Sequence, residues 1–201
     1  MWMISAIISK ILSVLFPPQC YLCHKEETPL CSSCLGYCKR ALSSPALYNT
    51  SIYDFQDPSI KKIIHAIKYF NRRDLIEPLT EKLAKEIRMT IGNKPSSNSW
   101  ILIPIPMPTF RKYMRGYNQA ELIARSLEKQ CQLAVSTDIL ARSHSLRRQV
   151  TARTRNERMK NQHNSFKVIK TVKNMNIILV DDVTTTGATL QEARNVLLRS
   201  G

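Results

Sequence analysis

No hydrophobic run in the 201-residue sequence is long enough to cross a lipid bilayer. The most apolar stretch, MWMISAIISKILSVLF, would form a helix of about 24 Å, whereas the hydrocarbon core measures about 30 Å. Lys10 interrupts this stretch, no basic segment precedes it, and no small-residue cleavage site follows it. Ser5, Ser9 and Ser13 recur every four residues and make a narrow polar stripe. We therefore predict that residues 1–16 form a helix that docks on the body of the protein, in preference to a membrane anchor.

Acidic residues are scarce. The chain has 15 Asp and Glu against 30 Lys and Arg, which gives a formal net charge of +15. Such an excess favours a polyanionic partner, either nucleic acid, a phosphorylated metabolite or an anionic membrane surface. A protein from a basic proteome would show the same excess without any such partner.

Two common catalytic arrangements are missing as well. A Gly-rich run that ends in Lys-Ser or Lys-Thr, as in P-loop nucleotide-binding proteins, is absent. No nucleophile, histidine and acid are arranged as in a hydrolase triad. The sequence also contains no internal repeat and no low-complexity tract, so it predicts one domain with a small appendage.

Cysteines are concentrated near the N-terminus. Cys20 and Cys23 form one C-x-x-C pair, and Cys31 and Cys34 form a second. Four thiolates in two such pairs are typical of a structural zinc site, and an iron–sulfur cluster is the alternative. His24 and Cys38 are lower-ranked substitutes as ligands. Because the rest of the chain resembles a cytoplasmic α/β protein, where thiols stay reduced, we expect a cytoplasmic location.

The order of the apolar patterns predicts an α/β fold. A Cys-rich loop segment over residues 17–40 is followed by a strand over 47–55, helices over 58–70 and 74–91, and a strand over 100–105. A helix over about 118–130, a strand over 177–182 and a helix over about 188–199 complete the chain. Strands that alternate with helices imply a mostly parallel sheet flanked by helices.

The segment IILVDDVTTTGATL, at 177–190, carries the strongest functional signal. Its aliphatic run predicts a buried parallel strand, and Asp181 and Asp182 stand at the strand's carboxyl end, where open parallel sheets bind ligands. The loop that follows consists of Thr184, Thr185, Thr186, Gly187, Ala188 and Thr189. Its N–H groups and hydroxyls suit a phosphate, and the two acids suit ribose hydroxyls or a divalent ion bound by the ligand. A purely structural strand and turn would leave the two adjacent acids unexplained.

This segment resembles the phosphoribosyl pyrophosphate (PRPP) motif of type I phosphoribosyltransferases. The resemblance implies that Asp181 and Asp182 bind the ribose and that residues 184–189 bind the 5-phosphate, with Mg²⁺ accompanying PRPP. In that fold the loop after strand 100–105 faces pyrophosphate, which assigns Arg111, Lys112 and Arg115 to the same ligand. A solvated basic loop is the alternative for these three.

Further motifs narrow the resemblance to the ComF family. They are IPIPMPTFRKYMRGYNQAELIARSLEK at 103–129, IIHAIKYFNRRDL at 63–75, the spaced residues Arg158, Asn161 and Phe166, and Pro-Pro-x-Cys-x-x-Cys at 17–23. The family resemblance implies a phosphoribosyltransferase-like sheet of about five parallel strands with a zinc ribbon in front, and a link to DNA uptake in natural transformation. After the docking helix predicted at 1–16, it implies a zinc ribbon over 17–44 and a phosphoribosyltransferase-like domain over 45–201. The family usually continues into another strand, so a truncated chain or a sheet that ends early is expected.

The basic segment at 141–160 has no clear periodicity. It contains one acid, Glu157, and seven cations: Arg142, Arg147, Arg148, Arg153, Arg155, Arg158 and Lys160. It suits an arm that faces nucleic acid, a lid over the site, or a solvated loop. Tyr113 and Tyr117 are candidates for stacking on bases.

Three functions follow from these patterns. The leading one is a ComF-like competence protein that handles incoming single-stranded DNA, together with proteins of the DNA-uptake machinery. The second is an active phosphoribosyltransferase in nucleotide salvage or related metabolism. The third is a DNA-binding module whose pocket is vestigial.

Overall fold

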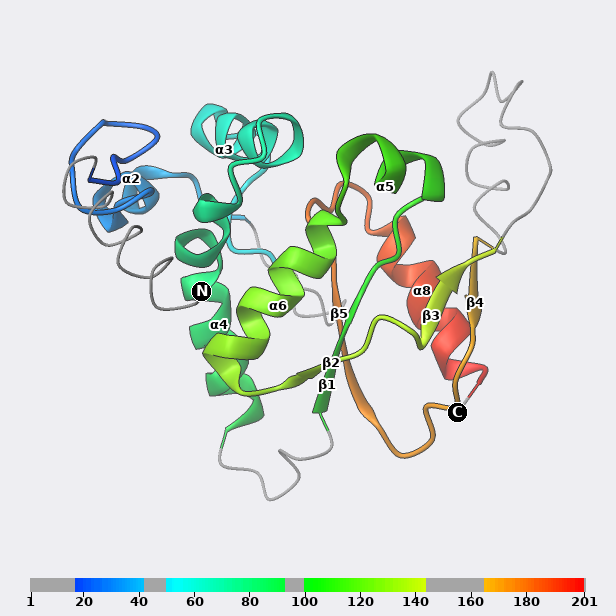
Figure 1. Ribbon diagram of the computed structural model, residues 1–201. Coiled ribbons are helices and arrows are strands. Elements are labelled where there is room, and N and C mark those ends of the chain that lie inside the picture. The colour runs from blue at the N-terminus through cyan, green and yellow to red at the C-terminus, as the bar shows by residue number, and fades with distance from the viewer. Residues whose placement is uncertain (1–16, 42–49, 93–99, 144–164, 201) are drawn as a thin grey trace, which may run out of the picture. The chain divides into compact units, whose positions relative to one another are not determined.

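The computed structural model describes residues 17–41, 50–92, 100–143 and 165–200 (Figure 1). The chain divides into two compact units, residues 1–81 and 82–201. The predicted docking helix at 1–16 lies outside the described residues. The segment bounds 1–16, 17–44 and 45–201 stay predictions.

Four helical elements form the described part of the first unit and its continuation: α2 (Ser32–Tyr37), α3 (Pro58–Tyr69), the 3₁₀ turn η2 (Arg73–Leu75) and α4 (Ile76–Ile91). The helices predicted at 58–70 and 74–91 are therefore confirmed. Asp57 caps α3, because its carboxylate accepts hydrogen bonds from the N–H groups of Ser59 and Ile60, and Pro58 occupies the first turn. The apolar face of α3 is buried through Ile60, Ile63, Ile64, Ala66 and Ile67.

Two expectations for the first unit were wrong. The Cys-rich segment at 17–40 is not only loop, because Cys31 caps the short helix α2. The predicted strand at 47–55 lies partly outside the described residues. Its described part forms one isolated bridge, Arg40 to Tyr53, and no strand. β-branched and aromatic residues favour a strand, but a strand also needs a partner along its length.

A parallel three-stranded sheet organises the second unit. Its order is β2 (Ala134–Val135), β1 (Trp100–Pro104) and β5 (Asn176–Val180). The register of β1 and β5 pairs Ile101 with Ile177 and Pro104 with Val180, so both strands end at the same edge. Helices α6 (Gln119–Cys131) and α8 (Ala188–Leu198) pack on this unit's strands (Figure 1). The α/β class with a parallel sheet flanked by helices is thus confirmed.

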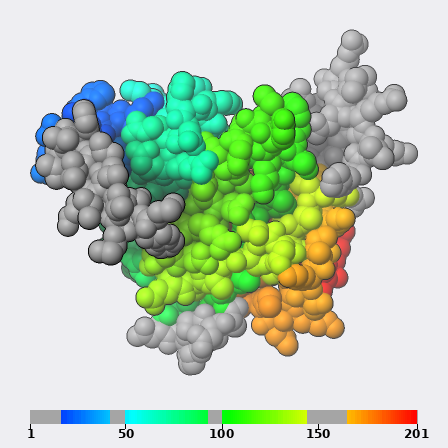
Figure 2. Space-filling view, viewed as in Figure 1, coloured from blue at the N-terminus to red at the C-terminus, as the bar shows by residue number. Residues whose placement is uncertain are grey.

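A separate antiparallel pair, which the sequence did not predict, completes the described strands. It consists of β3 (Leu140–Arg142) and β4 (Phe166–Val168), with Arg142 opposite Phe166. Figure 2 shows an orange surface, from the chain after residue 164, beside the yellow-green surface that precedes residue 143. In the described part of the chain the parallel sheet therefore has three strands rather than the implied five. Strands of only two or three residues are too short to show an alternating apolar pattern in the sequence.

The core of the second unit lies between these strands and α8. Its buried members are Ile103, Ile105, Ile139, Leu140, Phe166, Val172, Ala193 and Leu197. The core therefore contains residues of β1, β3, β4 and α8. It includes Ile103 and Ile105, close to the edge where β1 and β5 end. No helix in the described ranges has the length and hydropathy needed to span a bilayer.

Candidate functional site

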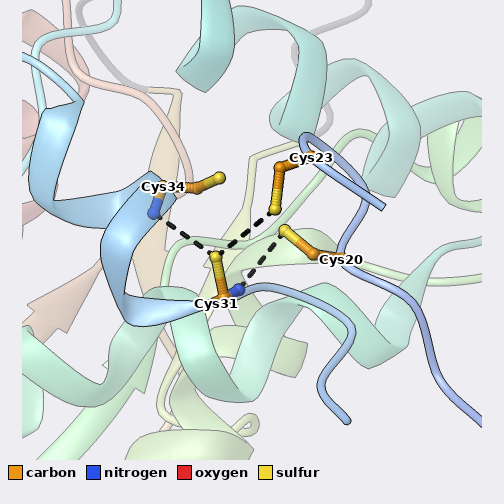
Figure 3. A group of neighbouring side chains, drawn as sticks. All are labelled: Cys20, Cys23, Cys31 and Cys34. Atoms are coloured by element: carbon orange, nitrogen blue, oxygen red, sulfur yellow. Dashed lines mark hydrogen bonds between the residues drawn. The ribbon is translucent and has the colours of Figure 1, made fainter. Parts of the chain in front are cut away.

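Four cysteine sulfurs converge in the first unit. The Sγ atoms of Cys20, Cys23, Cys31 and Cys34 all lie within 4.8 Å of one another (Figure 3). The Sγ atoms of Cys23 and Cys31 are 3.7 Å apart, too far for a disulfide and close to the roughly 3.8 Å edge of a tetrahedron with Zn–S bonds of about 2.3 Å. The four thiolates could hold one tetrahedral metal ion, consistent with structural zinc.

Backbone N–H groups point at the sulfurs. The N–H of Cys31 donates to Cys20 Sγ at 3.4 Å, and the N–H of Cys34 donates to Cys31 Sγ at 3.4 Å (Figure 3). The first pair is shaped by a tight turn, in which the N–H of His24 donates to the carbonyl of Cys20 at 2.8 Å and His24 adopts a φ of 61°. Such donors stabilise negative charge on sulfur, which a metal-bound thiolate carries.

The pKa values of two of these thiols are shifted in opposite directions. Burial alone would raise the pKa of Cys20, but the N–H groups of Cys23, Cys31 and Leu22 lower it to about 6. Burial raises the pKa of Cys34, and its hydrogen bonds with the other three thiols act in the same direction. Four thiols this close cannot all ionise without a compensating cation, which is the condition that a bound divalent ion satisfies.

The two substitute ligands do not join the cluster. The Cys38 thiol donates to the carbonyl of Cys34 at 3.3 Å, and it is buried. Among the described residues, the group that could hold a metal consists of the four predicted cysteines without His24 or Cys38.

The acidic pair lies just beyond β5 in the second unit. Asp181 and Asp182 follow Val180 directly, both are partly buried, and the N–H of Asp182 donates to Asp181 Oδ1 at 2.9 Å. The N–H of Ile105 donates to the carbonyl of Val180 at 2.8 Å, which continues the pairing of the two strands to this point. The acids therefore occupy the carboxyl edge of the parallel sheet, as the sequence predicted.

The threonine loop leads from the acids into α8. Gly187 precedes the helix with a φ of 72°, a left-handed conformation that glycine adopts without strain. The N–H of Ala188 donates to the hydroxyl of Thr186 at 3.4 Å. Thr185 and Thr186 are exposed, whereas Thr184 and Thr189 are partly buried. The loop thus presents hydroxyls and the first N–H groups of α8 beside two carboxylates.

The basic residues after β1 lie on a helix, which corrects the prediction of a loop. Arg111, Lys112 and Arg115 belong to α5 (Thr109–Arg115), which buries no residue. Arg115 donates to Gln119 Oε1 at 3.1 Å, and Lys112 lies 4.0 Å from a carboxylate oxygen of Glu121. Phe110, Tyr113 and Met114 have helical spacing but are all exposed, so α5 has no buried face. The three prolines before it suggested extended chain.

Arg142 is a site residue whose place the sequence did not show. The basic segment to which it belongs was expected to be a nucleic-acid-facing arm, a lid over the site or a solvated loop. In the structure the Nε of Arg142 donates to the carbonyl of Pro106 at 3.0 Å, and its guanidinium lies over the Phe166 ring at 5.0 Å. Burial lowers the pKa of Arg142, as does the charge of Arg111, while Glu192 and Asp181 oppose the change. Arg142 is therefore a half-buried cation within electrostatic range of Asp181.

One further expectation changed with the structure, and another falls mostly outside the described residues. Tyr117 is buried, with 8% of its surface exposed, so it does not offer its ring to a base, whereas Tyr113 is 85% exposed. Within the basic segment, Ala141 and Arg142 belong to β3 and Ser143 is described, but residues 144–160 lie outside the described residues.

Comparisons with known proteins agree with these motifs. The chain is 26% identical over 188 residues to the DNA utilization protein YhgH of Salmonella typhi, which covers 88% of this chain and 81% of that protein. It is 28% identical over 185 residues to the competence protein ComFC of Bacillus subtilis, covering 90% of this chain and 72% of that protein.

A third similarity is shorter. The chain is 33% identical over 102 residues to competence protein F of Haemophilus influenzae, covering 50% of this chain and 44% of that protein. No protein-family model matches the chain, and no solved structure matches it. The similarities to YhgH, ComFC and competence protein F support a ComF-family assignment for this chain.

Proposed function

We propose that this chain acts in competence-related DNA uptake in the cytoplasm, where it handles incoming single-stranded DNA and binds PRPP or a related ribose phosphate. The observation that supports the ligand site is the placement of Asp181, Asp182 and the threonine loop at the carboxyl edge of the parallel sheet. The names of the similar proteins, which refer to competence and DNA utilization, support the biological role.

Each part of the site has a chemical task in this proposal. Asp181 and Asp182 accept hydrogen bonds from the ribose hydroxyls, and the N–H groups and hydroxyls of residues 184–189 bind the 5-phosphate. Mg²⁺ enters with PRPP, bound mainly by the ligand's own phosphates. Arg111, Lys112 and Arg115, joined by Arg142, bind or attract the pyrophosphate end.

Calorimetry with PRPP and Mg²⁺ tests the ligand site. We expect binding to the wild type and its loss in the double variant Asp181→Asn with Asp182→Asn, while the circular dichroism spectrum stays unchanged. The control is Asp138→Asn, since Asp138 is an exposed acid that pairs with Lys170 elsewhere in the unit. Absence of PRPP and ribose 5-phosphate binding in the wild type would contradict the proposal and leave a DNA-binding protein with a vestigial pocket.

Titration with single-stranded DNA at two salt concentrations tests the DNA role. Contacts between cations and phosphates release counterions, so the affinity should fall steeply as the salt concentration rises. We expect the double variant Arg147→Ala with Arg148→Ala to bind less tightly. If both proteins bind equally, or if the affinity does not depend on salt, the basic segment does not bind DNA. It would then be a solvated surface or a lid over the substrate site.

An active phosphoribosyltransferase is the second candidate, and the paired carboxylates beside the start of α8 favour it. In this chemistry the protein mainly positions PRPP and stabilises the departing pyrophosphate. Release of pyrophosphate that depends on an added acceptor, and that disappears in the Asp181 and Asp182 double variant, would establish this activity.

A further inference from the structure

The C-terminal end of α3 carries aromatic rings on the outside of the first unit. Tyr69 is 61% exposed and Phe70 is 64% exposed, and His65, one turn earlier, is exposed as well. The function proposed above uses none of these three residues. We call them, together with Lys61, Lys62, Lys68, Arg72 and Arg73, the aromatic–basic surface.

The three rings are arranged against one another rather than against the core. The centroids of His65 and Tyr69 are 4.6 Å apart with an interplanar angle of 44°, and those of His65 and Phe70 are 5.5 Å apart at 61°. Residues four apart on a helix share a face, so His65 and Tyr69 meet, and Phe70 ends the helix beside them. Asn71 then turns the chain with a φ of 54°. The rings are thus ordered while their outer faces remain in solvent.

Cations outnumber acids in the sequence around the rings. Residues 58–73 contain five Lys and Arg and no Asp or Glu. The first acid that follows, Asp74, is held by Arg72 through bonds from Nε and Nη2 at 2.9 and 2.8 Å. Arg72 and Lys62 also lie over the ring of Tyr21, at 5.0 and 5.2 Å from its centroid.

These contacts link the aromatic–basic surface to the turn that contains Cys20 and Cys23. Tyr21 stands between Cys20 and Cys23, and its ring orders two cations of the aromatic–basic surface. A cation over an aromatic face is attracted by the negative charge of the ring's π-system. Two of the positive charges are therefore held in place by the same turn that brings two of the cysteine sulfurs together.

The composition of this surface fits a single strand of nucleic acid better than a membrane. A membrane-binding helix inserts an apolar face, but the isoleucine face of α3 is already buried within the fold. What remains outside is rings among cations, which is the pattern that stacks bases and neutralises phosphates in proteins that bind single strands. Duplex DNA hides its base faces, so the rings offer it no advantage.

We infer that the aromatic–basic surface binds single-stranded nucleic acid by stacking unpaired bases on Tyr69 and Phe70, while Lys61 and Arg73 contact phosphates. The inference deepens the proposed role in handling single-stranded DNA and rests on it. It assigns the base-stacking contacts to the first unit and not to Tyr113.

Fluorescence anisotropy with the full chain tests the inference. The probes are labelled oligothymidylate of about 20 nucleotides, a duplex of the same length and an abasic strand of the same length. The variant Tyr69→Ala with Phe70→Ala should bind oligothymidylate about tenfold to a hundredfold more weakly, because each stacked ring contributes to base binding. It should bind the abasic strand as the wild type does, since phosphate contacts are unchanged.

Matched variants separate stacking from general damage. Tyr69→Phe with Phe70→Tyr keeps both rings and should bind like the wild type. Met89→Ala removes a side chain that is 73% exposed elsewhere, and it should also leave binding unchanged. Lys61→Gln with Arg73→Gln should reduce the slope of log affinity against log salt by about 1.4, at about 0.7 for each phosphate contact.

The possible failures are distinguishable. If the wild type binds oligothymidylate and the Tyr69 and Phe70 alanine variant binds it equally well, the inference is wrong and the proposed function stands. If the wild type binds no single strand even at low salt, the proposed DNA role fails together with the inference. Binding to vesicles of anionic lipid without binding to oligothymidylate would identify a membrane surface instead and overturn the inference.

Discussion

The side-chain amide of Asn118 donates a hydrogen bond to the carbonyl of Ile105 at 2.9 Å. The Oδ1 atom of the same side chain accepts from the N–H of Ala120 at 3.2 Å and thereby caps α6. One buried amide therefore ties the end of the β1 segment to the start of α6. It closes the loop that contains α5 and its three basic residues.

Replacing Asn118 should destabilise the second unit without removing any apolar contact. Asn118→Ala leaves the carbonyl of Ile105 and the N–H of Ala120 without these partners in a buried place, so we expect the free energy of unfolding to fall by about 1–3 kcal/mol. Asn118→Asp keeps the cap but cannot donate to Ile105, so it should also destabilise. Urea denaturation measures both, and an Asp variant as stable as the wild type would show that the Ile105 bond contributes nothing.

Metal content should depend on four cysteines and not on the other two. Purified protein should contain about one equivalent of zinc, and serine at Cys20, Cys23, Cys31 or Cys34 should remove most of it. Cys38→Ser and Cys131→Ser are the controls and should retain the metal, because both lie outside the cluster. Chelation should unfold the segment around the cysteines and leave the second unit folded, as hydrogen exchange would show.

Less than a tenth of an equivalent of zinc in the wild type, without the colour of iron, would contradict the metal assignment. A coloured protein that contains iron would instead favour the alternative ion at the same four sulfurs.

Asp57, which caps α3, should make the stability of the first unit depend on pH. The N–H of Lys39, followed by those of Ile60 and Ser59, lowers the pKa of Asp57 in the folded state. Its contribution to stability is therefore complete above the unfolded pKa of about 3.9 and is lost as the pH falls through the lower folded value. Asp57→Ala should reduce the free energy of unfolding at neutral pH by about 1 kcal/mol.

Denaturant titrations at neutral pH and at about pH 3 measure this effect. Asp57→Asn keeps a capping oxygen for Ser59 and Ile60, so it should lose less stability at neutral pH and show a smaller change with pH. An alanine variant whose stability falls with acid as steeply as that of the wild type would show that the dependence comes from other carboxylates.

Gly187 should be needed for the shape of the threonine loop. No atom lies within 4 Å of a Cβ built at this position, so Gly187→Ala meets no steric obstacle, but its φ of 72° is unfavourable for alanine. We expect a loss of about 1–2 kcal/mol in the free energy of unfolding and weaker binding of ribose 5-phosphate. Gly36→Ala is the matched control, because Gly36 also has open space, lies in helix α2 and has no positive φ. Unchanged stability and binding in Gly187→Ala would show that the loop adapts.

Much of the fold and of the candidate sites could be predicted because the signals are local. The Pro58 start and isoleucine spacing of α3, the aliphatic run of β5 and the acids after it depend on residues close in the chain. The two C-x-x-C pairs likewise predicted which sulfurs would meet, since a two-residue spacer allows both thiols of a pair to reach one ion. These features need only helical or strand periodicity and short-range geometry.

Other features were decided by contacts between distant parts of the chain. Arg142 belongs to a basic segment, but it contacts the carbonyl of Pro106 and the ring of Phe166, neither of which is near it in sequence. Tyr117 is buried, although the residues around it suggested an exposed loop. Hydrophobic periodicity, charge and motif spacing determined the class of fold, the four thiol ligands and the acidic edge. Only tertiary packing decided that Arg142 packs on the Phe166 ring and which aromatic rings stay in water, because burial depends on the surface that the rest of the chain provides.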